Sequence, residues 1–315
     1  MAVGVIMDPI SQINPKKDTT FAMLLEAQRR NWPIFYMEQA DLFLKQNISC
    51  AKMRRLKLKD DIKNYYQFDT EIVQRLDKLS VILMRQDPPV DMQYIYTTQL
   101  LDMAERQGVL VANKPQSLRD YNEKLFTLQF PKCCPPTLLT HSIQDAKLFL
   151  DEHQDIIAKP IDGMGGSSVF RLRKDDPNVT VVLETLTANN QRYMLVQRYI
   201  PEINAGDKRI LMINGEPVDY VLARIAAEGE TRANLAVGGK GVAQKLSKND
   251  RLICQQVGPF LREKGLVFAG LDVIGNYLTE INITSPTGIR ELDKQCGLNI
   301  SRMFFDTIEN TLQNR

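Results

Sequence analysis

The stretch "GLDVIGNYLTEINITSP", residues Gly270–Pro286, reads as a β-hairpin that carries oxygen-bearing side chains on both arms. Side chains two positions apart on a strand point to the same face, so Glu280 and Asn282 share one. A two-residue "GN" turn places Asp272 opposite Thr279, away from that face. A three-residue "GNY" loop, with the extra residue absorbed at a bulge, instead pairs Asp272 directly with Glu280.

In the second register three oxygen side chains converge, and nothing basic lies nearby in the sequence to neutralise them. Like charges that oppose each other on a sheet destabilise it, so a divalent cation is the economical explanation. Oxygen ligands without histidine or thiolate favour magnesium, which commonly also bridges substrate phosphates. An exposed hairpin without a ligand is the alternative interpretation.

The composition of the 315-residue chain is typical of globular proteins, with 43% hydrophobic and 25% charged residues. Its net charge of +2 gives no long-range electrostatic reason to expect a nucleic-acid partner. No apolar run has membrane-spanning length, and the first ten residues are typical of a strand rather than a signal peptide. We therefore expect a cytoplasmic protein with no membrane partner. The five cysteines are odd in number and lack CxxC spacing, which argues against a disulfide framework or a zinc site.

The first third of the chain alternates strands and helices, which predicts a parallel sheet. The strands are "VGVIMD", "VILMR" and "VLVAN", and Arg85 stands at the end of the second. One helix begins near Asp18 and Thr19, which are both plausible caps. A second helix runs from about Asp91 to Gly108. Its predicted inward positions are Met92, Ile95, Leu100 and Met103.

The remainder has an antiparallel character, with a hairpin whose turn is "NG" in "KRILMINGEPVDYVLARI". We predict an N-terminal substrate-binding α/β domain over 1–122. A lid subdomain over 123–201 and a C-terminal subdomain over 202–315 follow it. A glycine-rich stretch over 226–242 is long enough to be a mobile loop that covers the site, with Arg232 at its middle.

"DGMGGSS" (162–168) follows a strand and has little side-chain bulk, so its backbone N–H groups can close on an anion. A plain tight hairpin is about as good an interpretation of this loop alone. Lys159 precedes it on a strand, where a fixed ammonium can meet a phosphate, because buried lysines are costly unless paired. Lys124 alone, on a predicted amphipathic helix, is expected to be solvated.

Asp207 and Arg209 share one face of a strand, and Arg224 ends the neighbouring strand. A surface ion pair is one interpretation. Binding of a carboxylate or phosphate by the two arginines is the other.

Taken together, these groups resemble the ATP-grasp superfamily, and from end to end the chain is similar to the prokaryotic glutathione synthetase family. The stretches that carry the resemblance are "MDPI", "MRQDPP", "NKPQSLRDYNEKLF", "KPIDGMGGSSVFR", "GDKRIL", "GETRANLAVGG" and "LDVIGNYLTEINITSPT". Their order and spacing make it specific. The departures are Lys240 in place of the usual arginine, and Ala158 and Val237 as mild variants. The implied architecture is mixed α/β and α+β, an ATP-grasp fold preceded by a parallel-sheet domain.

The resemblance implies ligation of γ-glutamylcysteine to glycine, with ATP as co-substrate, through an acyl phosphate. It places Lys124, Lys159, Gly163, Gly165, Gly166, Ser167, Gln197, Tyr199, Ile200 and Asp207 on ATP. It places Arg85, Arg209, Arg224, Asn282, Ser285, Pro286 and Thr287 on the peptide substrate. Asp272, Glu280 and Asn282 would hold Mg²⁺, with Mn²⁺ as an alternative. Arg209 and Arg232 would stabilise the reacting groups, and a homo-oligomer, a tetramer, is implied.

Two rival interpretations stay open at this point. One is another ATP-grasp ligase, such as a D-alanine–D-alanine ligase, which shares the phosphate and metal groups but not "MRQDPP" or "EINITSPT". The other is an ATP-binding protein without catalysis, which typically loses metal ligands, whereas all three stand here. A nicotinamide dehydrogenase is poorly supported, because the N-terminal strand lacks the glycine fingerprint of that class.

Overall fold

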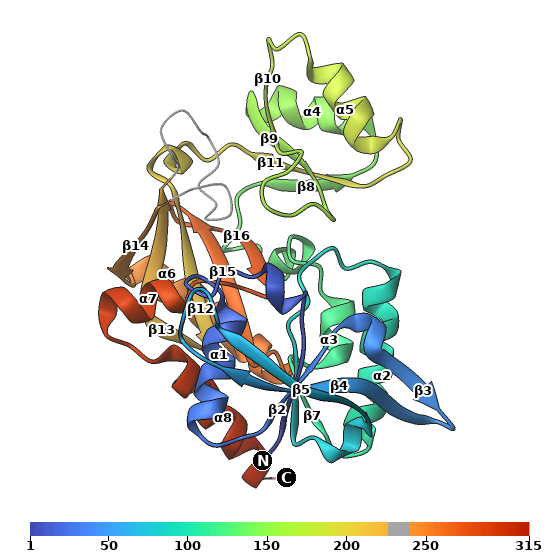
Figure 1. The fold of residues 1–315 in the computed structure, drawn as a ribbon. Helices are drawn as coiled ribbons and strands as arrows, with labels where there is room; N and C mark the ends of the chain where they lie inside the picture. Colours follow the sequence, from blue (N-terminus) through green and yellow to red (C-terminus); the bar gives the residue numbers. More distant parts are fainter. Residues whose placement is uncertain (226–239, 315) are drawn as a thin grey trace.

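Three β-sheets organise the chain in the computed structural model, which describes residues 1–225 and 240–314 (Figure 1). Sheets A and C form the body of the molecule, and the four-stranded sheet B forms a separate lobe above it. We call the lobe the lid; its strands lie between Thr137 and Arg198. The predicted lid subdomain over 123–201 begins earlier than this lobe, because Phe126 packs in the core of the body. The division at 122/123 and 201/202 remains our proposal. Within the described residues, no helix is long and apolar enough to cross a membrane.

Sheet A is the N-terminal sheet, with the strand order β3-β4-β2-β1-β6-β7 and β5 added beside β4. Its strands are β1 (Val3–Ile6), β2 (Ile34–Met37), β3 (Leu42–Lys45), β4 (Ile48–Leu58), β5 (Tyr66–Arg75), β6 (Val81–Met84) and β7 (Leu110–Ala112). The predicted parallel arrangement is confirmed for β1, β2, β6 and β7. The arm formed by β3, β4 and β5 is antiparallel. The sheet is therefore mixed.

The helices around sheet A are α1 (Thr19–Arg29), α2 (Met92–Arg106) and α3 (Pro115–Asp120). Asp18 caps α1 as predicted, since its side chain accepts a hydrogen bond from the Phe21 N–H. The predicted inward face of α2 is only partly right: Leu100 packs against the core, but Met92 is 56% exposed. The fully buried positions of the helix include Tyr94, Leu101 and Ala104. Apolar residues occur on both faces of this helix, so periodicity alone does not identify the packed one.

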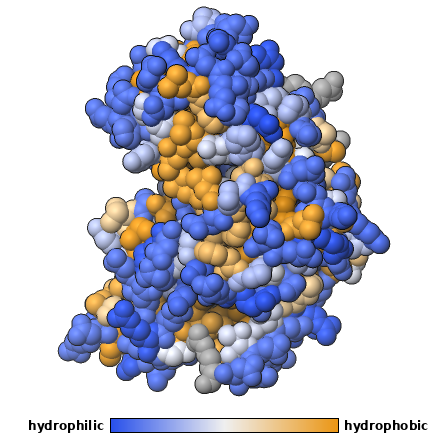
Figure 2. Space-filling view, turned by 180° about the vertical axis from the view of Figure 1, so that it is seen from behind, coloured by the Kyte–Doolittle hydropathy of each residue, from blue (hydrophilic) through white to orange (hydrophobic). Residues whose placement is uncertain are grey.

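Sheet B is antiparallel, with the order β10-β9-β11-β8. Its strands are β8 (Thr137–Thr140), β9 (Asp155–Pro160), β10 (Phe170–Arg173) and β11 (Met194–Arg198), and α4 (Ile143–His153) and α5 (Val179–Thr187) accompany them. The lid has a core of its own, built around Leu150, Leu183 and Val196. Figure 2 shows the notch between this lobe and the body, with apolar surface beside it.

Sheet C is antiparallel, with the order β14-β13-β12-β15-β16. It contains β12 (Asp207–Ile213), β13 (Glu216–Ile225), β14 (Lys240–Lys245), β15 (Phe268–Ile274) and β16 (Tyr277–Asn282), with helices α6 (Lys248–Glu263), α7 (Ile289–Cys296) and α8 (Ile300–Gln313). The last three residues of the predicted loop 226–242 thus belong to β14. The "NG" turn lies between β12 and β13 as predicted.

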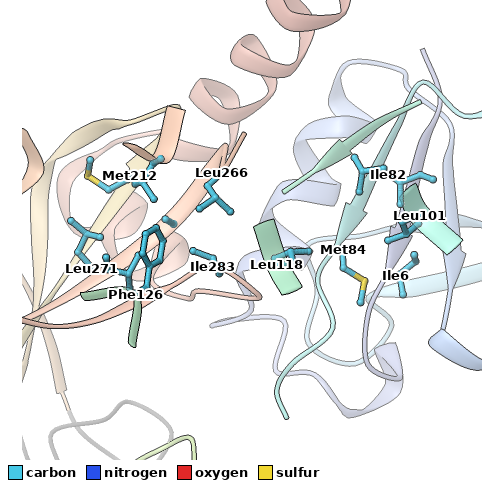
Figure 3. Close-up of a cluster of buried hydrophobic side chains, with 14 of the residues drawn as sticks. Ile6, Ile82, Met84, Leu101, Leu118, Phe126, Met212, Leu266, Leu271 and Ile283 are labelled. Atoms are coloured by element: carbon cyan, nitrogen blue, oxygen red, sulfur yellow. The ribbon is translucent and has the colours of Figure 1, made fainter. Parts of the chain in front are cut away.

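Sheets A and C share their hydrophobic cores, unlike the lid. One cluster runs from Ile6 and Met84 in sheet A, through Leu118 and Phe126, to Leu271 in sheet C (Figure 3). The body is therefore a single packed unit, and the lid is joined to it by two connections of the chain. Five short 3₁₀ segments complete the described part of the chain: η1 (Ile10–Gln12), η2 (Gln39–Asp41), η3 (Leu76–Lys78), η4 (Leu125–Gln129) and η5 (Pro201–Ala205).

Candidate active site

The hairpin of β15 and β16 pairs Asp272 with Glu280, so the two carboxylates occupy facing positions. The predicted bulge is confirmed, but the predicted three-residue loop is wrong, because Ile274 pairs with Tyr277 and leaves a two-residue Gly275–Asn276 turn. The register then shifts next to Asp272, where the two strands form a bulge. One extra residue in a strand restores the pairing that a two-residue turn alone forbids. The bulge, not the loop length, decides which face Asp272 occupies.

The oxygen donors on this hairpin fit a hard divalent cation. Asn282 donates its amide N–H to the Gly270 carbonyl at 3.3 Å, which leaves its amide oxygen available as a ligand. In the described part of the chain, no three histidine, cysteine, aspartate or glutamate side chains gather as a metal site. The predicted metal site contains only two residues of these types, Asp272 and Glu280, and its third ligand is the Asn282 amide. It stays a prediction.

Asp272 is the centre of a buried charge cluster. Arg209 donates to it from Nε at 2.5 Å and from Nη2 at 2.8 Å, and Arg224 Nη2 lies 2.9 Å from the same carboxylate. Burial alone would raise the pKa of Asp272, but the two arginines outweigh it and hold that pKa well below the ordinary value. These three contacts leave part of the lone-pair capacity of the carboxylate free, so it can also accept a cation.

The register of sheet C explains why the cluster forms. Arg209 on β12 lies directly opposite Asp272 on β15, and Asp207 lies directly opposite Arg224 on β13. Gly270 is needed beside them, because a Cβ there would come within 2.9 Å of the Arg209 Cδ atom.

Asp207 is engaged within this cluster. Both of its carboxylate oxygens accept from Arg224, one of them at 2.7 Å from Nε. Asp207 and Arg224, predicted for the nucleotide and the peptide substrate respectively, are therefore bonded to each other. Contact of Asp207 with a ribose remains a prediction.

Lys159 lies on the lid side of the cleft and, unlike the charged groups around Asp272, has no partner of opposite charge bonded to it among the described residues. It lies near the end of β9 and is 6% exposed. Its ammonium forms neither a hydrogen bond nor an ion pair with residues 1–225 or 240–314. Burial lowers the pKa of Lys159, although the carboxylates of Glu280 and Glu123 act in the other direction. A buried cation without a counterion is costly, and it is suited to receive an anion.

The glycine-rich loop continues from β9 and carries the predicted phosphate-binding residues. Gly165 and Gly166 have φ of +65° and +76°, a backbone conformation that favours glycine. The Ser167 N–H donates to the Met164 carbonyl at 3.1 Å, so this part of the loop forms a tight turn.

Lys124 approaches from the body, contrary to its interpretation as a solvated side chain. It is 3% exposed, and its ammonium donates to the Gly163 carbonyl at 2.5 Å and to the Glu123 carboxylate. The same ammonium lies 3.8 Å from the Glu280 carboxylate. Sequence reasoning missed Glu123, although it directly precedes Lys124 in the quoted "NEKLF" stretch.

The predicted peptide-binding residues meet at the loop after β16. Arg85 donates to the Pro286 carbonyl at 3.0 Å and to the Thr20 hydroxyl at 3.0 Å. Burial lowers the pKa of Arg85 to about 10. The Ser285 hydroxyl is hydrogen-bonded to Asp87, which follows Arg85. Arg209 reaches the same loop, with its Nη1 atom 3.5 Å from the Thr287 carbonyl.

The predicted adenine segment connects β11 to the body. The Gln197 side chain donates to the Thr137 hydroxyl at 3.0 Å and is buried in sheet B, and Ile200 is buried as well. The Tyr199 ring packs under Arg171, whose guanidinium carbon lies 3.6 Å from the ring centroid. These contacts fix the segment, and its contact with adenine remains a prediction. Arg232 lies outside the described residues.

The arrangement brings together two lysines, an arginine–aspartate cluster and an oxygen donor set between the lid and the body. Such a site suits phosphoryl transfer, which depends on positioning and charge neutralisation more than on a proton-transfer group.

Comparison with known proteins identifies the family. The profile described as "Prokaryotic glutathione synthetase, ATP-grasp domain" matches residues 123–297, and the N-terminal-domain profile of the same family matches residues 1–119. The chain belongs to the prokaryotic glutathione synthetase family.

Relatives in this family match over nearly their whole length. The glutathione synthetase of Pseudomonas aeruginosa is 56% identical over 313 residues, which cover 99% of both chains. That of Vibrio vulnificus (strain YJ016) is 53% identical over 311 residues, covering 99% of this chain and 98% of the relative.

Solved structures support the ATP-grasp fold. The D-cycloserine synthetase DcsG matches with a TM-score of 0.67 at 11% identity, over 98% of this chain and 100% of the other. The ATP-grasp ligase PsnB, solved with the precursor peptide PsnA2 and AMPPNP, matches with a TM-score of 0.64 at 15% identity, over 99% and 98%. At these low identities, the two structures show only that this chain has the same fold as theirs.

Proposed function

We propose that this chain catalyses the ATP-dependent ligation of γ-glutamylcysteine to glycine, giving glutathione, ADP and phosphate. Beyond family membership, the observation that carries the proposal is the pair of lysines at the lid–body junction. Lys124 from the body and Lys159 from the lid both lie near Glu280, and the Lys159 ammonium lacks a counterion within the described residues. A polyphosphate between them satisfies Lys159 and explains why a lysine is buried there.

The residues around the cleft account for activation of a carboxylate. A carboxylate is a poor acylating group, so it first attacks the γ-phosphate of ATP to form an acyl phosphate and release ADP. The two lysines neutralise the charge of the transferred group. The amine of glycine then attacks the acyl carbon, and phosphate leaves. Arg209 is our candidate for stabilising the oxyanion at that carbon, because it lies beside the substrate loop at Thr287.

We further propose that Asp272, Glu280 and Asn282 hold the divalent cation that accompanies ATP, with Mg²⁺ favoured and Mn²⁺ as the alternative. Their donor set, two carboxylates and an amide, has the oxygen chemistry that Mg²⁺ prefers. Such an ion supplies neutralisation of phosphate charge. Asp272 can serve it through the lone-pair capacity that Arg209 and Arg224 leave free, and because the ion then competes with both arginines for the carboxylate, we expect at least one of these contacts to lengthen.

The cytoplasmic location is also a proposal, and so is the homotetramer, which follows from the family resemblance. Light scattering after size-exclusion chromatography tests the assembly. A mass of four chains supports the tetramer, and a mass of one chain contradicts it.

The experiment that tests the activity combines the purified chain with ATP, Mg²⁺, γ-glutamylcysteine and glycine. We expect glutathione, ADP and phosphate to appear in equal amounts. Replacing the peptide and glycine with D-alanine tests the rival ligase, and calorimetry with AMPPNP tests binding without turnover. Turnover with D-alanine alone, or tight AMPPNP binding without ADP release from ATP, would contradict the proposal.

A further inference from the structure

Three consecutive residues, Asn122–Lys124, connect the lid loop, the metal-site strand and the phosphate site. The Asn122 amide nitrogen donates to the Ile161 carbonyl at 2.9 Å, at the start of the glycine-rich loop. The Glu123 carbonyl accepts from the Ile281 N–H at 2.8 Å, between the proposed ligands on β16. The segment is thus fixed on both sides of the cleft.

The Asn122 side chain also fixes the backbone of this segment. Its amide oxygen accepts from the Lys124 N–H at 3.0 Å and from the Leu125 N–H at 3.1 Å. This is a typical aspartate or asparagine cap of a turn. The Glu123 side chain is therefore carried on a backbone that has little freedom to move.

Two lysines approach the same volume, but different surroundings hold them. Lys159 extends from the middle of a sheet, with strands on both sides of β9. Lys124 extends from a short irregular segment, and ordering the four rotatable bonds of a lysine side chain costs conformational entropy. Its ammonium therefore needs a fixed partner to face the cleft before the nucleotide arrives. The Glu123 carboxylate and the Gly163 carbonyl are the partners within hydrogen-bonding distance.

We propose that Glu123 is a positioning residue, which acts on the reaction through Lys124 by holding its ammonium toward the phosphates. The inference rests on the nucleotide-binding part of the proposed function and on none of its peptide substrates. Glu123 is 19% exposed on its side chain, and its carboxylate is hydrogen-bonded to the ammonium that it would position.

A contribution to stability alone does not explain why Glu123 stands here, because its carboxylate lies near a second carboxylate. Glu123 lies close enough to Glu280 for the two to repel each other, and it borders the proposed site of the polyphosphate. Two carboxylates near one site oppose each other's ionisation, so the pair costs stability unless a cation lies between them. The Lys124 ammonium is that cation, 3.8 Å from Glu280 and hydrogen-bonded to Glu123.

A double-mutant cycle tests this assignment by measuring the affinity of the full chain for AMPPNP with Mg²⁺ in a calorimeter. We expect Glu123→Gln to weaken binding about tenfold, the loss typical of one charge-assisted contact. In a Lys124→Met background the same substitution should change binding less than about twofold, because the group it positions is gone. Equal losses in both backgrounds would overturn the proposal.

Two further variants separate positioning from other roles. Glu123→Asp keeps the charge, and the flexible lysine can follow the shorter carboxylate, so we expect binding within about threefold of the parent chain. Glu26→Gln is the matched control: Glu26 is buried and paired with Arg29 and Arg30 on α1, so its loss should lower the melting temperature without changing the affinity.

A role for Glu123 as a direct metal ligand predicts a different result. The Mg²⁺ concentration needed for half-maximal AMPPNP binding would then rise in Glu123→Gln, whether or not Lys124 is present. That outcome would overturn the positioning role. If glutathione were not formed but the cycle still showed coupling, the proposed peptide substrates would fail while this inference stood.

Discussion

The charged groups on the two sides of the cleft differ in how they are balanced. On the body side, Arg209 and Arg224 are fully engaged by Asp272 and Asp207 across neighbouring strands of sheet C. On the lid side, the Lys159 ammonium lacks a hydrogen bond or ion pair within the described residues. Among the described residues, the charges of the body side are neutralised before any substrate binds, whereas the lid side has a buried cation without a hydrogen-bonded or ion-paired partner, which we propose a phosphate satisfies.

This difference separates stability from function in the two regions. A neutralised cluster contributes to the fold, because removing one member leaves uncompensated buried charge. A buried cation without a counterion opposes the fold and is retained for what it binds. Substitutions in the two regions should therefore change stability in opposite directions, while both weaken function.

The largest effect should follow Asp272→Asn. The change leaves Arg209 and Arg224 short of one counterion and removes a proposed metal ligand, so we expect turnover to fall about a thousandfold. We also expect a loss of about 3 to 5 kcal/mol in the free energy of unfolding. Steady-state ADP release and urea unfolding check the two effects. The control is Asp219→Asn, at an aspartate that is 79% exposed beside Arg251. A variant as stable and active as the parent would contradict the cluster's role.

Lys159→Met should weaken nucleotide binding and at the same time raise the free energy of unfolding. We expect AMPPNP with Mg²⁺ to bind about 10 to 100 times more weakly, because a charged contact to phosphate is lost. The free energy of unfolding should rise by about 1 to 3 kcal/mol, since the burial of an unsatisfied polar group is relieved. Lys57→Met, at an exposed lysine paired with Asp69, should change neither. A loss of stability in Lys159→Met would show that this ammonium has a counterion after all.

The same comparison predicts a dependence on pH. Burial lowers the pKa of Lys159 below the ordinary lysine value of 10.5, so between these two values the unfolded chain binds more protons than the folded one. Below that window the charged lysine destabilises the parent relative to Lys159→Met, and the difference should shrink as pH rises through it. Urea unfolding of both chains across alkaline pH measures this. A difference that stays constant with pH would contradict the buried, charged lysine.

The smallest effect concerns metal removal. In the nucleotide-free chain the arginines already neutralise Asp272, so a chelator should shift the melting temperature by less than about 1 °C. The chelator should nevertheless abolish the stabilisation that AMPPNP with Mg²⁺ confers. A large fall in the melting temperature of the nucleotide-free chain would mean that the hairpin depends on a bound ion to fold.

The sequence predicted those features that local patterns determine. The strand predicted to carry Lys159 before the glycine-rich loop is confirmed as β9, and so is the cap at Asp18. The charge cluster could not be predicted, because it depends on Arg209 lying opposite Asp272, 63 residues away, in the register of sheet C. The sequence linked the pairing of Asp272 with Glu280 to a bulge, but it did not indicate that the bulge lies next to Asp272 and follows a two-residue turn. The environment of Lys124 likewise requires the lid loop and β16 to meet.

The most direct test of the account is the position of the metal in a crystal grown with Mn²⁺ and AMPPNP. We expect an anomalous peak about 2.1 Å from oxygens of Asp272, Glu280 and Asn282. The phosphates should lie between Lys124 and Lys159, and at least one arginine contact to Asp272 should be lengthened. A metal bound away from this hairpin, with Arg209 unchanged on Asp272 and phosphates distant from Lys159, would contradict the account.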